Sequence, residues 1–384
     1  MPMNVRFFTL HLPVIIFLVS CAAPSTDLPS TAHLDKASIR REHIGYGINY
    51  AKERDKKIQS TFYQIIKNTG SELCDRKLRP GLGFDYGVRR PRLSWWQSLS
   101  AEQKQEEKDL QELNPTAEDN SIYVRFVIPG SAADKAGLQE HDQILSIFGI
   151  SAPGGNGVAD KFQEILDKNL TPNFIGMPVE MEVSRKGKVI SLTINPDEIC
   201  PYSLVIDKST HQVNAFSDGE KVYLTEEIID YLPEQNDLAA VLSHELAHNT
   251  MGHIDSQQLN QTVGVIAGAV FDVLADTDGS GMLIGMELGG NAYSKDFENE
   301  ADYVSAYYMA RAGYDYKAMR DLYKKLAARD MGSIYVDGVT HPKPQERYAL
   351  LYETAQEIDL KKNFNEDLLP DFKARNSHLE DKRD

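Results

Sequence analysis

The chain has 384 residues, of which 41% are hydrophobic and 26% are charged. This composition is that of a soluble globular protein of two or three domains, and it excludes the fibrous and disordered classes. A formal net charge of −16 repels nucleic acid phosphates and anionic lipid head groups, so neither is expected as a partner.

The N-terminus carries a targeting signal. Arg6 precedes an apolar stretch over residues 7–19, which is shorter than the roughly 20 residues of a membrane-spanning helix. We expect a signal peptide over 1–20, with an inserted anchor or a buried helix as the alternatives. The sequence Leu-Val-Ser-Cys at 18–21 resembles the bacterial lipoprotein box. That resemblance implies a mature chain that begins at a lipid-modified Cys21, and Ala22 after it favours the outer membrane.

A Pro/Ser/Thr-rich linker over 21–45 follows, without a periodic apolar face. The next segment, 46–78, holds apolar residues at helical spacing and ends its periodic part before Gly70. The spacing predicts an amphipathic helix over about 46–68 that packs on the rest of the protein.

The region 79–198 has a different character. Its centre, SIYVRFVIPGSAADKAGLQEHDQILSIFGI at 121–150, alternates as strands around a short helix and resembles a PDZ domain of the bacterial protease type. A helix near 161–170 and a hairpin that turns at Lys186-Gly187 complete the resemblance. A charged insertion over about 88–120 interrupts the domain.

Upstream of that insertion, four residues spell the loop whose backbone N–H groups bind a peptide carboxylate in PDZ domains: Gly81, Leu82, Gly83 and Phe84. The resemblance implies that the partner is a protein C-terminus. An ordinary Gly-rich turn is the alternative interpretation of these four residues.

Two cysteines flank this region. Cys74 lies just before it and Cys200 just after it. Because the two ends of an inserted domain usually lie close together, we predict a Cys74–Cys200 disulfide in an oxidising compartment. Two separately buried thiols are the alternative.

Residues 199–360 begin as strands, with a turn at Asp218-Gly219, and continue as helices near 236–252, 294–311, 316–329 and 343–358. The last residues, 361–384, are charged and aperiodic, which predicts a mobile tail. The fold class is therefore α+β: a mainly helical domain with a small sheet, and an inserted β-rich domain.

The chemistry centres on SHELAHNTMGHID at 243–255. In a helix His244 and His248 share one face, so both imidazoles can bind one metal, and Glu245 can reach a water beside it. A chance His-Glu-x-x-His remains the alternative for this pentapeptide alone. His253 is a poor third ligand because it would face some 140° away from His248 on a continuing helix; we expect a structural residue at the helix end.

A catalytic zinc needs a third protein ligand. Glu298 and Asp302 lie four apart on a predicted helix, whereas Glu300 faces elsewhere. This pattern resembles the glutamate-zincin arrangement, in which the Glu binds zinc and the acid one turn later holds a ligand His at its distal N–H. A solvated acidic face is the alternative.

Five elements in order resemble the HtpX-like zinc metallopeptidases, which are related to the CAAX prenyl protease. They are Asn214-Ala215-Phe216, the His-Glu-x-x-His helix, Glu298-x-x-Ala301-Asp302, Ala312-Gly313-Tyr314-Asp315, and His341-Pro342 with Arg347. A bacterial lipoprotein member with an inserted PDZ domain matches nearly the whole mature chain, and it lacks the transmembrane helices of the membrane-embedded members.

The resemblance implies one zinc ion per chain, held by His244, His248 and Glu298. Glu245 is then the general base for attack of a zinc-bound water on a peptide bond. By family position His341 is an oxyanion donor, unless it only caps a helix near Pro342. The strand at Asn214, Ala215 and Phe216 would receive an extended substrate, and the apolar segment at 262–290 would form a helix and a flexible lid over the cleft.

The expected function is a periplasmic, lipid-anchored zinc endopeptidase that cleaves misfolded or PDZ-recruited proteins. A chaperone or assembly scaffold with latent protease activity is the alternative. A PDZ-centred binding protein with a dead peptidase half is disfavoured, because His244, Glu245, His248 and Glu298 are all present.

Overall fold

The protein is described by a computed structural model over residues 35–88, 121–155, 157–275, 280–291, 294–329 and 344–372. The chain divides into two compact units, Met1–Ile44 and Gly45–Asp384, and apart from the first residues of one helix the following concerns the second. The predictions on the signal peptide, on Cys21, on the insertion after residue 88 and on His341 lie outside the described residues.

The predicted N-terminal helix is present and longer than expected. Helix α1 covers Lys36–Asn68 and is followed by α2 at Gly70–Leu73. Its buried face repeats at helical spacing with Ile58, Phe62, Ile65 and Ile66, each at most 4% exposed, so the apolar periodicity in the sequence marks the packed face.

The PDZ region forms a sheet in the order β2-β3-β4-β6-β7, with β5 paired to β4. Its strands and helices are β2 (Phe84–Val88), β3 (Ile122–Val127), α4 (Ala132–Lys135), β4 (Gln143–Ile147), β5 (Ile150–Ser151), α5 (Val158–Asn169), the 3₁₀ turn η2 (Pro172–Phe174), β6 (Val179–Arg185) and β7 (Lys188–Ile194). Along β3 buried and part-buried residues alternate, as expected for a sheet that packs one face on a core. The β6–β7 hairpin turns at Lys186-Gly187, both with positive φ, as predicted.

The two ends of this region lie side by side. Strand β1 (Arg79–Gly81) pairs antiparallel with β8 (Asp197–Ile199). Just outside this ladder, Cys74 and Cys200 form a disulfide with their Cα atoms 5.7 Å apart, which confirms the predicted pairing. The disulfide joins the chain at the point where the inserted region begins and ends.

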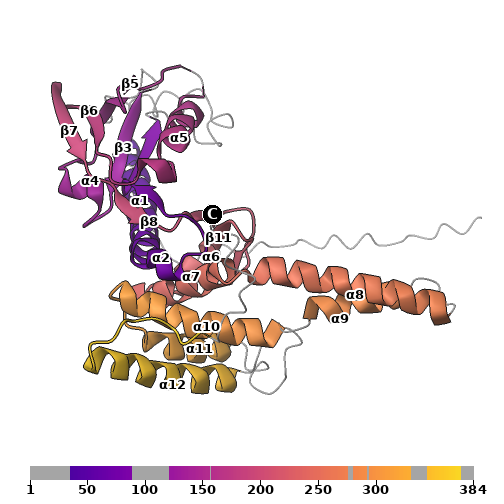
Figure 1. Ribbon diagram of the computed structural model, residues 1–384. Coiled ribbons are helices and arrows are strands. Elements are labelled where there is room, and N and C mark those ends of the chain that lie inside the picture. The colour runs from indigo at the N-terminus through magenta and orange to yellow at the C-terminus, as the bar shows by residue number, and fades with distance from the viewer. Residues whose placement is uncertain are drawn as a thin grey trace, which may run out of the picture. The chain divides into compact units, whose positions relative to one another are not determined.

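The remaining chain forms a three-stranded sheet and a set of helices (Figure 1). Strand β11 (Lys221–Thr225) lies between β9 (Ser203–Asp207), parallel to it, and the antiparallel edge strand β10 (Ala215–Ser217). The helices are α6 (Glu226–Tyr231), α7 (Gln235–Thr250), α8 (His253–Ala275), α9 (Ser280–Asn291), α10 (Ser294–Arg311), α11 (Ala318–Arg329) and α12 (Pro344–Asn363). The fold class is α+β, as predicted.

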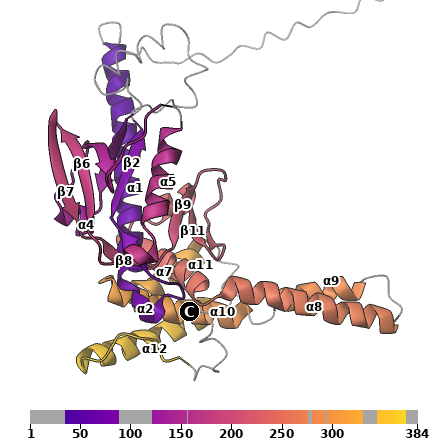
Figure 2. The same cartoon turned by 45° about the horizontal axis from the view of Figure 1, so that its top comes forward.

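Two expectations need correction. The segment at 262–290 holds more helix than expected: α8 and α9 form a helical hairpin and lie side by side in both views (Figures 1 and 2). The expected tail also begins later than residue 361. Helix α12 extends to Asn363, and the chain beyond it returns against α10, where Asp371 N–H donates to the Tyr303 hydroxyl at 2.8 Å.

No described helix combines the length and the apolar character that a membrane crossing demands.

Candidate metal centre

Helix α7 presents both motif histidines to the same point. His244 and His248 direct their Nε2 atoms at each other across 3.1 Å, as their spacing of four residues predicts. The other sides of α7 are packed, and Leu238, Leu242 and Leu246 are at most 2% exposed. The buried helix therefore fixes both imidazoles in position.

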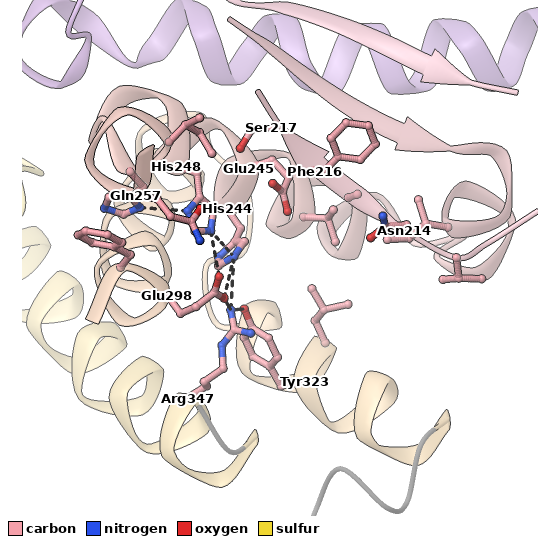
Figure 3. Close-up of a pocket in the computed structure, with 18 residues that line it drawn as sticks. Asn214, Phe216, Ser217, His244, Glu245, His248, Gln257, Glu298, Tyr323 and Arg347 are labelled. Carbon is pink, nitrogen blue, oxygen red and sulfur yellow. Dashed lines mark hydrogen bonds and ion pairs between the residues drawn. The ribbon is translucent and has the colours of Figure 1, made fainter. Parts of the chain in front are cut away.

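Helix α10 completes the group. Glu298 places its Oε2 atom 3.5 Å from His244 Nε2 and its Oε1 atom 3.4 Å from His248 Nε2 (Figure 3). One ligand atom from each of the three residues lies within 4.8 Å of the others. Two imidazoles and one carboxylate are the donor set of a zinc site that keeps an open position, so these residues fit that metal.

A carboxylate holds the far side of His244. The Nδ1 atom of His244 lies 3.0 Å from Oδ1 of the fully buried Asp302. The Tyr323 hydroxyl donates to the same oxygen at 2.6 Å. Asp302 thus occupies the place that the sequence indicates for it, one turn beyond Glu298.

Arg347, at the start of α12, supplies the cation behind this carboxylate. Its Nε and Nη2 atoms donate to the two oxygens of Asp302 at 2.7 Å each, and Nη2 lies 3.3 Å from Glu298 Oε2. Burial opposes ionisation of Asp302, but the charge and hydrogen bonds of Arg347 outweigh it and lower the Asp302 pKa to about 2.

The metal-free site also binds a proton strongly. Burial opposes the charged form of His244, yet Asp302 and Glu298 outweigh burial and raise the His244 pKa to about 9. At His248 burial dominates and lowers the pKa. The negative charge of Asp302 and Glu298 at the group of ligand atoms therefore attracts a cation.

His253 lies closer to the site than the sequence indicated. Its Nδ1 atom is 3.0 Å from Nδ1 of His248, and its Nε2 atom is 3.0 Å from Glu300 Oε2. Its two ring nitrogens thus face His248 and Glu300, and it does not belong to the group formed by His244, His248 and Glu298. The turn at Gly252, with φ of +67°, ends α7 and directs His253 back toward it. Helical spacing cannot reveal such a contact.

Glu245 lines a cleft of about 570 Å³ next to the ligand group. It lies beside Ser217 of β10 (Figure 3), whose side chain bonds to it. Burial raises the pKa of the Glu245 carboxyl. A carboxylate of raised pKa beside a metal position can accept a proton from water near neutral pH.

The predicted substrate strand forms one wall of this cleft. Asn214, Ala215 and Phe216 line it, and Ala215 and Phe216 belong to the edge strand β10. Of the described residues of the α8–α9 hairpin, those that line the cleft are His253, Ile254 and Gln257, in the first turns of α8. Farther along α8 an apolar stripe is exposed at Leu259, Val263, Ile266 and Val270, and none of these four residues lines the cleft.

The predicted carboxylate loop lines a second cavity, of about 310 Å³. Gly81–Phe84 form one side, and Leu166 of α5 and Leu170 just after that helix form another. Gly83 has a φ of +78°, and a Cβ atom there would lie 2.2 Å from the Ser131 Cβ. Glycine is therefore required at 83.

Together the fold and the site combine a His-Glu-x-x-His helix with a glutamate on a following helix. Residues 181–355 match the model of peptidase family M48, and residues 98–156 match that of the PDZ domain. The chain is therefore similar to the M48 peptidases over one segment and to PDZ domains over the segment before it. The M48 match begins within β6, which pairs with β4 and β7 in the PDZ sheet, so the peptidase fold itself starts after β7.

Named relatives agree with this assignment. The chain is 31% identical over 153 residues to the beta-barrel assembly-enhancing protease of Yersinia pestis, which covers 35% of this chain and 31% of that one. It is 31% identical over 155 residues to the mitochondrial metalloendopeptidase OMA1 of Schizosaccharomyces pombe, covering 39% and 45%. A stretch of 74 residues is 39% identical to protease RseP of Photorhabdus luminescens, covering 19% and 29%. The chain spans less than half the length of each of these relatives.

Proposed function

We propose that this chain is a zinc-dependent endopeptidase of the bacterial cell envelope that cleaves misfolded or PDZ-recruited proteins. The observation that carries the proposal is the convergence of His244, His248 and Glu298 from two buried helices, with Glu245 in the adjoining cleft. The similarity to relatives named as proteases supports it.

His244, His248 and Glu298 would hold the metal, which would act as a Lewis acid that activates water and polarises a carbonyl group. Glu245 accepts the proton of the attacking water and passes it to the leaving amine. Its buried surroundings favour the neutral acid, so it can give the proton up again. The family resemblance gives His341 the role of oxyanion donor in this scheme.

The substrate lies along β10. An edge strand has unpaired backbone groups, so an extended peptide can add to it as a further strand. Asn214, Ala215 and Phe216 place that edge in the wall of the same cleft as Glu245. A pairing of this kind selects unfolded segments, because a folded protein does not present a free extended strand.

The PDZ cavity recruits substrates by a free C-terminus. Leu82, Phe84, Leu166 and Leu170 give it apolar walls suited to an apolar terminal side chain. Of the described residues that line it, Arg79 is the one cation, and it can attract the terminal carboxylate.

We place the protein in the periplasm, tethered by acyl chains on Cys21, on the strength of the lipoprotein-box sequence at 18–21. This placement provides the oxidising compartment in which the Cys74–Cys200 disulfide persists.

Hydrolysis of a permanently unfolded protein tests the proposal. We expect the wild type to cleave it and Glu245→Gln to lose at least about 100-fold in rate while it keeps its metal and its melting temperature. Equal turnover by the two would contradict the role of Glu245. If neither cleaves but both suppress aggregation of the unfolded protein, the chaperone alternative holds instead.

A further inference from the structure

The third histidine of the motif region lies in a defined chemical environment. His253 begins α8 and its side chain is only 3% exposed. Its ring stacks on Phe297, with centroids 4.7 Å apart and an interplanar angle of 19°. Both ring nitrogens have polar partners: Nδ1 lies 3.0 Å from His248 Nδ1, and Nε2 lies 3.0 Å from Glu300 Oε2.

The two ligand histidines are thus held in the same manner. Each directs Nε2 at the ligand group and Nδ1 away from it. Behind His244 lies Asp302, and behind His248 lies His253, which is itself bonded to Glu300. Asp302 and Glu300 both belong to α10, the helix that supplies Glu298.

The proton positions follow from donor and acceptor rules. A metal on Nε2 of His248 needs the lone pair of that atom, so the neutral imidazole carries its proton on Nδ1. This N–H donates to Nδ1 of His253, which must present a lone pair. The proton of His253 then lies on Nε2 and donates to the Glu300 carboxylate. The Nδ1 atom of His248 and both nitrogens of His253 thus have a partner, and the direction of each of these hydrogen bonds is fixed.

We propose that His253 is a positioning residue for the metal site, which accepts the His248 Nδ1–H and is held in the required tautomer by Glu300. The inference rests on the proposed metal centre and adds to it. By fixing the ring orientation and tautomer of His248, the His253–Glu300 pair raises the affinity of His248 for the metal, as partners behind ligand histidines do.

If His253 served only for packing, its ring would be needed but its two ring nitrogens would not. His253→Phe keeps a ring to stack on Phe297 and removes both nitrogens. His253→Asn removes the ring but keeps an acceptor, because its Oδ1 is the same number of bonds from Cα as Nδ1 of histidine. Phe297→Leu is the matched control, since it removes the stack and leaves both hydrogen bonds of His253.

The test is zinc affinity of the full chain, measured by competition with a chromophoric chelator, together with the melting temperature of the metal-free protein. We expect His253→Phe to weaken zinc binding about 10–100-fold. We expect His253→Asn to regain most of that loss and Phe297→Leu to bind as the wild type does. In the zinc-loaded wild type, nitrogen NMR of the His248 ring should show the proton on Nδ1.

Wild-type affinity in His253→Phe would overturn the inference, and so would an Asn variant as weak as the Phe variant. Both results leave the zinc site of the wild type intact, so they would not touch the proposed function. We expect a His244→Ala control to fail to bind zinc. If the wild type also failed to bind zinc, that result would contradict the proposed function itself.

Discussion

Arg347 of α12 donates two parallel hydrogen bonds, each 2.7 Å long, to the two carboxylate oxygens of Asp302 in α10. Both groups are shielded from water, since Asp302 is fully buried and the Arg347 side chain is 11% exposed. Because Asp302 in turn contacts His244 of α7, this pair ties three helices together directly behind the metal position. The geometry of the site therefore depends on a residue 103 positions along the chain from His244.

Removal of Arg347 takes away the permanent cation that bonds both oxygens of the buried Asp302 carboxylate. We expect Arg347→Met to lower the free energy of unfolding by about 3–5 kcal/mol, the usual cost of breaking a buried pair from one side. Urea unfolding of the metal-free proteins measures this. Arg347→Lys serves as the control: it keeps the charge, cannot bond both oxygens in parallel, and should lose less. A change under about 1 kcal/mol in Arg347→Met would contradict this account of the pair.

The same pair predicts a dependence on pH. In the wild type the Asp302 pKa is lowered to about 2, below that of an unfolded aspartate. Its contribution to stability is thus present above about pH 4 and is lost as the pH falls toward 2. Without Arg347 less positive charge opposes the effect of burial, so the Asp302 pKa of Arg347→Met should lie above that of the wild type, and acidification should destabilise that variant less. Urea unfolding midpoints at neutral pH and near pH 3 would contradict the prediction if both proteins responded identically.

The Cys74–Cys200 disulfide closes a sequence separation of 126 residues. Restriction of so long a loop in the unfolded chain stabilises the folded state, and loss of such a bond typically costs about 2–5 kcal/mol. We expect the double variant Cys74→Ser/Cys200→Ser to melt at a lower temperature than the oxidised wild type. Reductant should lower the wild-type melting temperature to that of the variant and leave the variant itself unchanged. A wild type that does not respond to reductant while its thiols become reactive would contradict a stabilising role.

The PDZ loop offers a matched pair of glycines. Gly83 and Gly137 both have positive φ, of +78° and +82°, but only at Gly83 would a Cβ atom collide with a neighbour, Ser131. We expect Gly83→Ala to abolish binding of a peptide with a free, apolar C-terminal residue, and Gly137→Ala to retain it. Fluorescence anisotropy measures both, and the same peptide with an amidated C-terminus is the ligand control. Equal binding by the two variants would refute the assignment of this loop as the carboxylate site.

Local periodicity accounts for most of what could be predicted. The spacing of His244 and His248, and of Glu298 and Asp302, fixes which side chains share a helix face, and the structure brings these faces together. The apolar face of α1 and the turn at Lys186-Gly187 follow from equally local rules. The disulfide followed from the position of its cysteines at the two ends of an inserted region.

Contacts set by tertiary structure or by an irregular turn could not be predicted in this way. The bond between Arg347 and Asp302 joins two helices whose packing no local pattern encodes. His253 reaches His248 only because Gly252 breaks the helix, whereas a continuing helix would carry it away. The apolar segment at 262–290 lacks charged periodicity, so a second helix there was not distinguishable from a lid.

The central claim is that His244, His248 and Glu298 hold one zinc ion. Mass spectrometry of the metal content of the purified full chain tests it most directly. We predict close to one zinc per wild-type chain, the same content in Glu245→Gln, and a large loss in Glu298→Ala at an unchanged fold. Wild-type zinc content in Glu298→Ala, or no zinc in the wild type after dialysis against zinc, would contradict the claim.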